Sequence, residues 1–327
     1  MHERVGDTLT PDSCQTRAAN TGSTIYRKAP VAPTGCAPTG WVPSVWARAF
    51  GQQINDHYKA FADPRAEGML AGFQSGFDLL RGEWIPGHRD AAGIYMAYAN
   101  AGVDVNGLVT NPAATGYLLK QTGALNLNAW SGGIYWTHYG PGEWYVDAVL
   151  QATRYEGSAT TEFVRLPTKG YGFLSSLETG LPIAVPLLGP GFVIEPQAQI
   201  IWQRVSFDGA NDGLGDVALG TTSGTTGRIG VRGRWTLISA NGQVWQPYVR
   251  ANLWRDWGAQ ETTVYSGVDT VPLREQATRV DLGGGLTTRV STNLSLYAQG
   301  GYQFAAGNTD GGRRDGVKGD IGGRYTW

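Results

Sequence analysis

Charged residues are scarce in this chain of 327 residues, and the two signs nearly balance. They make up 16% of the sequence, against about 25% in an average soluble domain. The formal net charge is -1, and no dense run of lysine and arginine occurs. Because proteins that bind nucleic acid need a basic surface to neutralise phosphates, we do not expect nucleic acid among the partners.

Long apolar runs are absent as well. No stretch approaches the roughly 18 apolar residues of a membrane-spanning helix, and the mean hydropathy is -0.25. This excludes a helical membrane protein but not a transmembrane β-barrel, whose strands need only about 10 residues and alternate apolar with polar side chains. The first residues, MHERVGDTLT, lack the charged and apolar regions of a signal peptide, so an exported protein would carry its signal upstream.

Glycine and large aromatic residues are abundant instead, with 48 Gly, 12 Trp and 15 Tyr against 2 Cys and 3 Met. This composition favours strands and turns over helices. From residue 43 onward, about twelve segments alternate apolar and polar side chains as half-buried strands do. We expect these strands near 45–55, 66–80, 89–103, 123–138, 142–155, 170–185, 192–207, 228–239, 243–257, 277–290, 292–304 and 316–327.

Short and long connections alternate between the segments. Short ones lie at 81–88, 139–143, 186–191, 240–243 and 291–292, and the fourth of them, ANGQ, contains the Asn-Gly hairpin signal. Most of the others are long, polar and rich in Gly, Thr and Asp, as at 102–121, 207–227 and 258–276. With an even number of strands, all turns then lie at one rim and all loops at the other, as in an outer-membrane barrel.

The two faces of the segments differ in chemistry. In 228–237, Ile229 and Val231 share one face, and the arginines at 228, 232 and 234 share the other. The polar face contains Arg, Asp, Gln and Asn, which suit pairing across a confined lumen better than bulk water. We therefore predict an all-β fold, a twelve-stranded antiparallel transmembrane β-barrel. The predicted pore-lining residues are Arg48, Asp147, Glu178, Glu195, Arg228, Arg232, Arg234, Arg250, Arg279, Asp281, Arg289 and Arg324.

Several glycines fall inside the predicted strands, where they would weaken an ordinary sheet. We expect them at bends of a closed sheet, or beneath aromatic rings that lie across a neighbouring strand. They include Gly76, Gly93, Gly132, Gly133, Gly283, Gly284, Gly285, Gly300 and Gly301.

The last segment, VKGDIGGRYTW, keeps its alternation to the final residue. Ile321, Tyr325 and Trp327 share the apolar face, and Lys318 and Arg324 lie on the other. The ends of a domain usually fray, so a regular strand that continues to the last residue needs a partner. We expect this strand to pair with the first one and so to remove both edges of the sheet.

Residues 43–327 resemble the translocator domain of classical autotransporters, the type V secretion proteins of Gram-negative bacteria. The resemblance rests on an ordered set of stretches: VWARAFG (45–51), GFQSGFDLL (72–80), EWYVDAVLQATRY (143–155), GYGFLSSLETGLPI (170–183), FVIEPQAQIIWQRVSF (192–207), VWQPYVRANLWRDW (244–257), VDLGGGLTTRVSTNLSLYAQGGYQF (280–304) and GGRYTW.

The resemblance implies a monomeric barrel in the bacterial outer membrane that takes part in exporting its own N-terminal passenger domain to the cell surface. It implies contact with outer-membrane lipid, the barrel-assembly machinery and periplasmic chaperones. It also implies that Ile321, Tyr325 and Trp327 form the signal for assembly.

Residues 1–42 form a separate part in this interpretation. MHERVGDTLT resembles the stretch that precedes the barrel in some family members, which implies a short helix in or near the pore; a disordered tail is the alternative, since Pro11 stops any helix. Residues 11–42 form a linker rich in Pro, Ala and Thr. We expect Cys14 and Cys36 to form a disulfide in the oxidising periplasm. Two thiols without neighbouring histidines do not complete a metal site.

A catalytic constellation is not evident. The four histidines are scattered, and His138, beside Trp136, is expected to pack near the lumen face. The sequence contains no GxSxG, no HExxH and no phosphate loop after a strand, nor the Asn-Asn pair at which some family members cut their passenger. The inward acids fit salt bridges to arginine better than a catalytic acid pair. We expect neither enzymatic activity nor a cofactor or metal. The alternatives are an outer-membrane porin, an outer-membrane hydrolase and a soluble β-sandwich.

Overall fold

The computed structural model describes residues 43–58, 62–239, 243–258, 260–267, 269–274, 277–291, 293–307 and 312–327. Cys14, Cys36 and the expected helix of the first ten residues lie outside this range. The described residues include no helix with the length and apolar character that a membrane-spanning helix requires.

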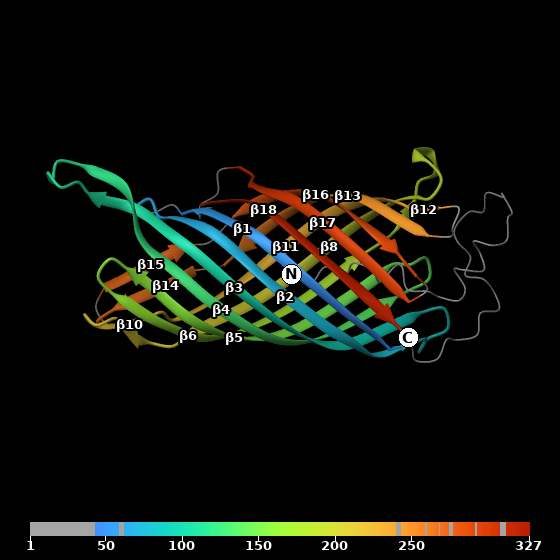
Figure 1. The fold of residues 1–327 in the computed structure, drawn as a ribbon, viewed down its shortest axis with the longest axis horizontal. Coiled ribbons are helices and arrows are strands. Elements are labelled where there is room, and N and C mark those ends of the chain that lie inside the picture. The colour runs from blue at the N-terminus through green and yellow to red at the C-terminus, as the bar shows by residue number, and fades with distance from the viewer. Residues whose placement is uncertain are drawn as a thin grey trace.

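Twelve long strands form the wall of a closed antiparallel barrel (Figure 1). They are β1 (Ser44–His57), β2 (Arg65–Gly82), β3 (Arg89–Thr110), β4 (Tyr117–Tyr139), β5 (Tyr145–Thr161), β6 (Arg165–Gly180), β8 (Phe192–Phe207), β11 (Thr221–Trp235), β13 (Val244–Trp257), β16 (Thr278–Arg289), β17 (Leu294–Ala305) and β18 (Arg313–Thr326).

The barrel closes between its first and last strands, as the sequence predicts. β1 pairs with β18 from Ser44 opposite Thr326 to His57 opposite Arg313. Each remaining wall strand pairs with its neighbours along the chain, including β8 with β11 across an external connection. Every wall strand therefore has two partners, and the sheet exposes no open edge to lipid.

The strands form here because their alternation suits a wall with lipid outside and polar groups inside. On β11, Ile229 and Val231 are exposed on the outer face, whereas Arg228 and Arg234 are buried on the inner face. The same pattern in β18 places Ile321 outward and Arg324 inward. The predicted arrangement of faces is confirmed along these strands.

Aromatic rings cover glycines on neighbouring strands, as expected for several of them. A Cβ atom added at Gly133 would lie 2.3 Å from the ring of Tyr95, and one at Gly76 would lie 2.4 Å from the ring of Trp46. Gly132 has nothing within 4 Å of such an atom, since it faces outward. The covered glycines thus accommodate the interior rings that a side chain would displace.

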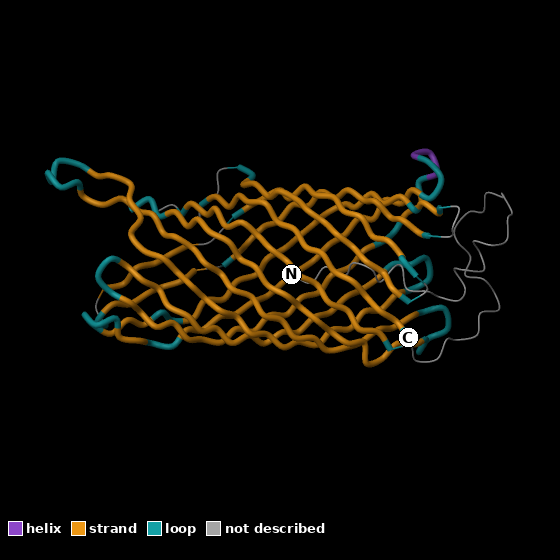
Figure 2. Tube along the Cα trace, viewed as in Figure 1, coloured by secondary structure: helices purple, strands orange, loops and turns teal. Residues whose placement is uncertain are grey.

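The two rims of the barrel differ, as Figure 2 shows. We name the rim with the connections 83–88, 140–144, 181–191, 236–243 and 290–293 the turn rim, and the opposite one the loop rim. The turn rim also contains the short strands β7 (Ile183–Ala184) and β12 (Leu237–Ile238) and the 3-10 helix η2 (Pro186–Leu188). Both β1 and β18 reach this rim at Ser44 and Thr326. In outer-membrane barrels the short turns are periplasmic.

The loop rim is more ordered than the sequence suggests. Residues 102–121 are not a long loop: β3 and β4 continue as a hairpin beyond the wall, with a bulge at Val105 and Asn106 (teal arm in Figure 1). The connection between β5 and β6 is only 162–164, because β5 continues past the predicted end at 155 and β6 begins before the predicted start at 170.

The two other predicted loops also contain strands. β9 (Ala210–Asn211), β10 (Asp216–Ala218), β14 (Gln260–Tyr265) and β15 (Asp269–Arg274) form a separate small sheet at this rim, in the order β15-β14-β10-β9. Local Gly, Thr and Asp content predicts loops, but backbone pairing between distant connections overrides it.

Candidate functional site

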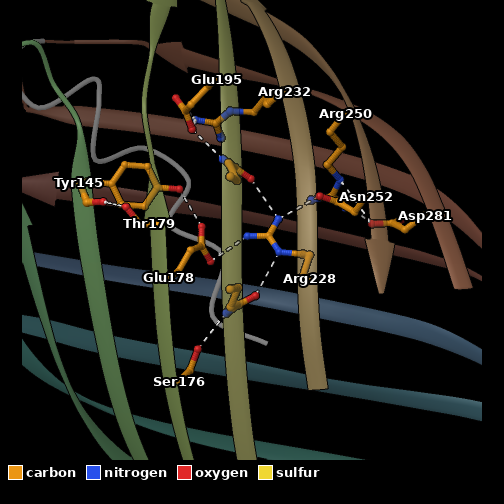
Figure 3. A network of polar contacts seen from close by, with 12 residues as sticks. Tyr145, Ser176, Glu178, Thr179, Glu195, Arg228, Arg232, Arg250, Asn252 and Asp281 are labelled. Atoms are coloured by element: carbon orange, nitrogen blue, oxygen red, sulfur yellow. Dashed lines mark hydrogen bonds and ion pairs between the residues drawn. The ribbon is translucent and has the colours of Figure 1, made fainter. Parts of the chain in front are cut away.

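Arg228 on β11 lies at the centre of a polar network inside the barrel, which Figure 3 shows from close by. Its Nη2 atom is 3.0 Å from Oε2 of Glu178 on β6, and its Nη1 atom donates to Oδ1 of Asn252 on β13 at 3.0 Å. The hydroxyl of Tyr145 donates to Glu178 at 2.7 Å. These inward side chains come from four different strands, so the network joins a broad part of the wall.

Three further ion pairs extend this network along the interior. Arg232 Nη2 lies 3.3 Å from Oε1 of Glu195. Asp281, which is 0% exposed, lies 3.0 Å from Nζ of Lys318 and 4.0 Å from Nε of Arg250. Asn252 also donates to Asp281 at 2.9 Å. A buried charge requires partners of this kind, because removing it from water costs several kcal/mol.

Trp254 on β13 packs against several of the interior cations. Its side chain is 2% exposed. The guanidinium carbons of Arg228 and Arg279 lie 5.5 and 5.6 Å from its ring centroid, and the ammonium of Lys318 lies at 6.0 Å. Arg279 also forms an ion pair with Asp256, at 2.8 Å. The indole therefore packs among cations whose charges are balanced by nearby carboxylates.

A second polar centre lies at the seam where the barrel closes. Asp78 on β2 is 0% exposed, and Nη1 of Arg324 on β18 is 2.6 Å from its Oδ2. The hydroxyls of Ser44 on β1 and Tyr135 on β4 donate to the same carboxylate. Arg324 also donates to Ser44, at 3.1 Å. One carboxylate thus connects both sides of the seam near the turn rim.

A neutral aromatic cluster adjoins this seam centre. Tyr95, Tyr135 and Val149 form a buried cluster against Trp46. The indole Nε1 of Trp46 donates to the hydroxyl of Tyr135 at 3.0 Å, and Tyr95 donates to Gln151 at 2.8 Å. Tyr135 also donates to Asp78, so this neutral cluster is directly connected to the charged centre at the seam.

The predicted pore-lining residues that remain have diverse surroundings. Asp147 accepts a hydrogen bond from Thr137 at 3.0 Å, and Arg48 donates to Gln74 at 2.8 Å. Arg234 is 7% exposed, and its Nε and Nη1 atoms have no hydrogen-bond partner among the described residues. Arg289 is half-buried at the end of β16.

Sequence reasoning missed Asp78, Asp256 and Lys318, which complete the ion pairs of predicted arginines and of Asp281. Asp78 precedes two consecutive leucines, where the alternation ends, so it resembles a rim residue in the sequence. The inward position of Lys318 can be predicted from the sequence, because Lys318 shares the face of Arg324.

The expected position of His138 near the lumen is wrong. His138 has the parity of the exposed Ile134 and Trp136 on β4, whereas Tyr135 and Thr137 are buried on the inner face. It therefore lies on the outer face near the turn rim. A carboxylate and a second histidine cover it, so its burial does not come from the lumen.

The interior chemistry is that of paired charges. Carboxylates accept contacts from arginine, lysine, tyrosine and amide groups that come from other strands. Among the described residues, no three His, Cys, Asp or Glu side chains are placed to hold a metal ion together. Such an interior offers donors and acceptors to a polar polypeptide along much of the wall.

The chain is similar to autotransporter proteins in sequence and in fold. The family model described as "Autotransporter beta-domain" matches residues 45–301. The BrkA autotransporter of Bordetella pertussis is 28% identical over 272 residues, which cover 80% of this chain and 24% of BrkA. This chain therefore spans about a quarter of the length of that relative.

Two solved structures share the fold. The crystal structure of the β domain of Bordetella BrkA superposes with a TM-score of 0.65 at 24% identity, covering 88% of this chain and all of that one (100%). The transport unit of AIDA-I from Escherichia coli gives a TM-score of 0.68 at 18% identity, covering 87% and 90% of the two chains. Together with the family match over most of its length, the closed twelve-stranded barrel shows that this chain belongs to the autotransporter β-domain family of the bacterial outer membrane.

Proposed function

We propose that residues 43–327 are the translocator domain through which an N-terminal passenger of the same polypeptide reaches the cell surface. In this proposal residues 1–42 are the linker and the end of a pore helix, between passenger and barrel. The observation that carries the proposal is the family match over residues 45–301, which coincides with a closed barrel whose interior is polar.

The proposed mechanism is physical and includes no enzymatic step. Paired charges such as Arg228 and Glu178, 3.0 Å apart, present hydrogen-bonding groups to a passing chain without attracting one sign of charge strongly. Because most of the charges described above already have a partner, a polypeptide of mixed composition can pass without being trapped by a single strong contact.

Assembly is proposed to depend on the last strand, with periplasmic chaperones and the barrel-assembly machinery as partners and lipid around a monomeric product. Ile321, Tyr325 and Trp327 are all exposed on the outer face, as a recognition signal must be before insertion and as lipid contact requires afterwards. The ring of Trp327 lies 5.7 Å from that of Phe77 on β2, so the signal also packs beside the seam.

Surface display of a reporter tests export directly. A signal peptide and a small reporter domain are placed before residue 1, and protease is added to intact cells. We expect cleavage of the reporter together with a heat-modifiable, folded barrel in the outer membrane. A folded barrel whose reporter remains in the periplasm would refute translocation. The matched control joins the same reporter to a barrel without β18, which should not display it.

Conductance in planar bilayers tests the proposed role of residues 1–42 in closing the pore. We expect low conductance from residues 1–327 and higher conductance after deletion of residues 1–42. Equal conductance would reject the plug. A porin would conduct in both forms and show no surface display, so the two experiments separate the alternatives.

A further inference from the structure

A chain of three side chains on the outer face of the barrel contributes to none of the interior networks. Asp90 is the second residue of β3, His138 is the second-last residue of β4, and His88 lies in the turn between β2 and β3. Asp90 and His138 are direct cross-strand neighbours, so their side chains leave the wall on the same side. All three lie at the turn rim.

The contacts in this chain fix the orientation of His138. Its Nδ1 atom is 2.9 Å from Oδ1 of Asp90, whose side chain is 3% exposed. The indole of Trp136 donates to the same oxygen at 3.0 Å, which holds the carboxylate in place. Because Nδ1 bears the proton given to Asp90, the Nε2 atom of His138 presents a lone pair.

That lone pair faces a second imidazole nitrogen. Nδ1 of His88 lies 2.9 Å from Nε2 of His138, and the two ring centroids are 4.9 Å apart. Trp144 packs against both rings, with centroids 6.1 Å from His88 and 5.5 Å from His138. The two rings are therefore held together from one side.

We propose that His88 and His138 form a divalent transition-metal site of the copper(II) or nickel(II) class, with Asp90 as the carboxylate that orients His138. A metal–imidazole bond is about 2.0 to 2.1 Å long, and two such bonds at a right angle separate their nitrogens by about 2.9 Å. The right angle is typical of square-planar and tetragonal ions, whereas tetrahedral zinc needs a wider separation.

The carboxylate–histidine–metal order matches the way proteins orient metal-binding histidines. Binding requires that the proton between the two rings moves from Nδ1 to Nε2 of His88 and that both rings turn until their lone pairs point at the metal, so no net proton is released. The site supplies two protein ligands, and solvent fills the other positions. It is thus an exchangeable rim site and not a structural centre.

Copper titration of the purified, refolded chain tests this proposal. The chain carries no affinity tag, and His2 is replaced by alanine because a histidine beside an amino terminus chelates copper itself. We expect one copper(II) per chain, an electron paramagnetic resonance spectrum with nitrogen couplings from imidazole, and quenching of tryptophan fluorescence.

Substitutions separate this site from background binding. We expect His88→Ala and His138→Ala each to lower the copper affinity at least about tenfold and to remove the imidazole couplings, and Asp90→Asn to weaken binding about tenfold with unchanged stoichiometry. His57→Ala, at the loop rim, is the matched control and should bind as the parent does. Heat-modifiable mobility confirms the fold of each variant, and His88 lies in a turn, where alanine is tolerated.

Two results would overturn the proposal. The first is absence of stoichiometric copper binding by the folded parent, which would leave the pair as a hydrogen bond only. The second is unchanged affinity and spectrum in folded His88→Ala. Neither result bears on surface display, so the translocator proposal stands or falls separately.

Discussion

Replacing Asp78 by asparagine should destabilise the barrel more than any change to an exposed ion pair. The substitution keeps the size of the side chain but removes the charge that lies 2.6 Å from Arg324. It leaves a buried guanidinium, 9% exposed, without its carboxylate. The hydroxyl groups of Ser44 and Tyr135 then face an amide, which accepts fewer hydrogen bonds.

The expected cost follows from the burial of both partners. Removal of one partner of a buried pair costs about 3 to 5 kcal/mol, and the lower end applies here because asparagine keeps part of the hydrogen bonding. A loss of about 3 kcal/mol corresponds to a roughly hundredfold change in the unfolding equilibrium. Urea unfolding in detergent micelles, followed by tryptophan fluorescence, measures this free energy.

Two variants make the measurement decisive. Glu162→Gln breaks the contact with Lys120 at the loop rim, where the side chains are 66% and 57% exposed, and we expect a change below about 0.5 kcal/mol. Asp78→Asn combined with Arg324→Gln should cost clearly less than the sum of the single changes. If Asp78→Asn costs no more than Glu162→Gln, or if the double variant is additive, the seam contact does not stabilise the barrel as argued.

Three other changes have expected outcomes. Gly133→Ala should lower the free energy of unfolding by about 1 to 3 kcal/mol in the same urea assay, because its Cβ atom would lie 2.3 Å from a tyrosine ring. Gly132→Ala is the control and should not destabilise the barrel, since its Cβ atom would have nothing within 4 Å. Equal effects of the two substitutions would contradict the packing argument. Trp327→Asp should reduce the heat-modifiable barrel recovered from membranes more than the same change in an external loop does, and normal recovery would count against an assembly role. Hydrogen bonds from His57 and a neighbouring arginine lower the pKa of Asp63 below its usual 3.8. This stabilising contact is therefore complete at neutral pH and is lost as the pH falls through the lowered pKa. Carboxyl NMR should show the pKa of Asp63 rising towards 3.8 in His57→Ala, and no rise would reject the contact.

The sequence predicts the wall well because each wall strand faces lipid on one side. The segment predicted at 192–207 coincides with β8, Phe192–Phe207, where Glu195, Gln197 and Gln199 share one face. The long β3–β4 hairpin was not predicted because beyond the membrane both faces of a strand meet water, and the alternation that identifies strands disappears.

The interior was predicted by residue type and not by partner. Parity alone assigns Arg228 and Glu178 to the inner face, but only the register and tilt of β6, β8 and β11 bring their side chains to 3.0 Å. For His138 the predicted face itself is wrong. It is expected near the lumen face beside Trp136, although the parity that it shares with the exposed Ile134 and Trp136 places it outside.

The contacts of β18 explain how the closed register is specified from inside the barrel. Arg324 reaches across β1 to Asp78 on β2, and Lys318 reaches across β17 to Asp281 on β16, at 2.6 and 3.0 Å. Both carboxylates are 0% exposed in the closed barrel. A slip of β18 by two residues would keep its apolar face towards lipid, so the outer surface alone does not exclude that register. The same slip would separate both buried ion pairs at once. The inner charges on either side of β18 therefore select the register that the outward aromatic residues leave open.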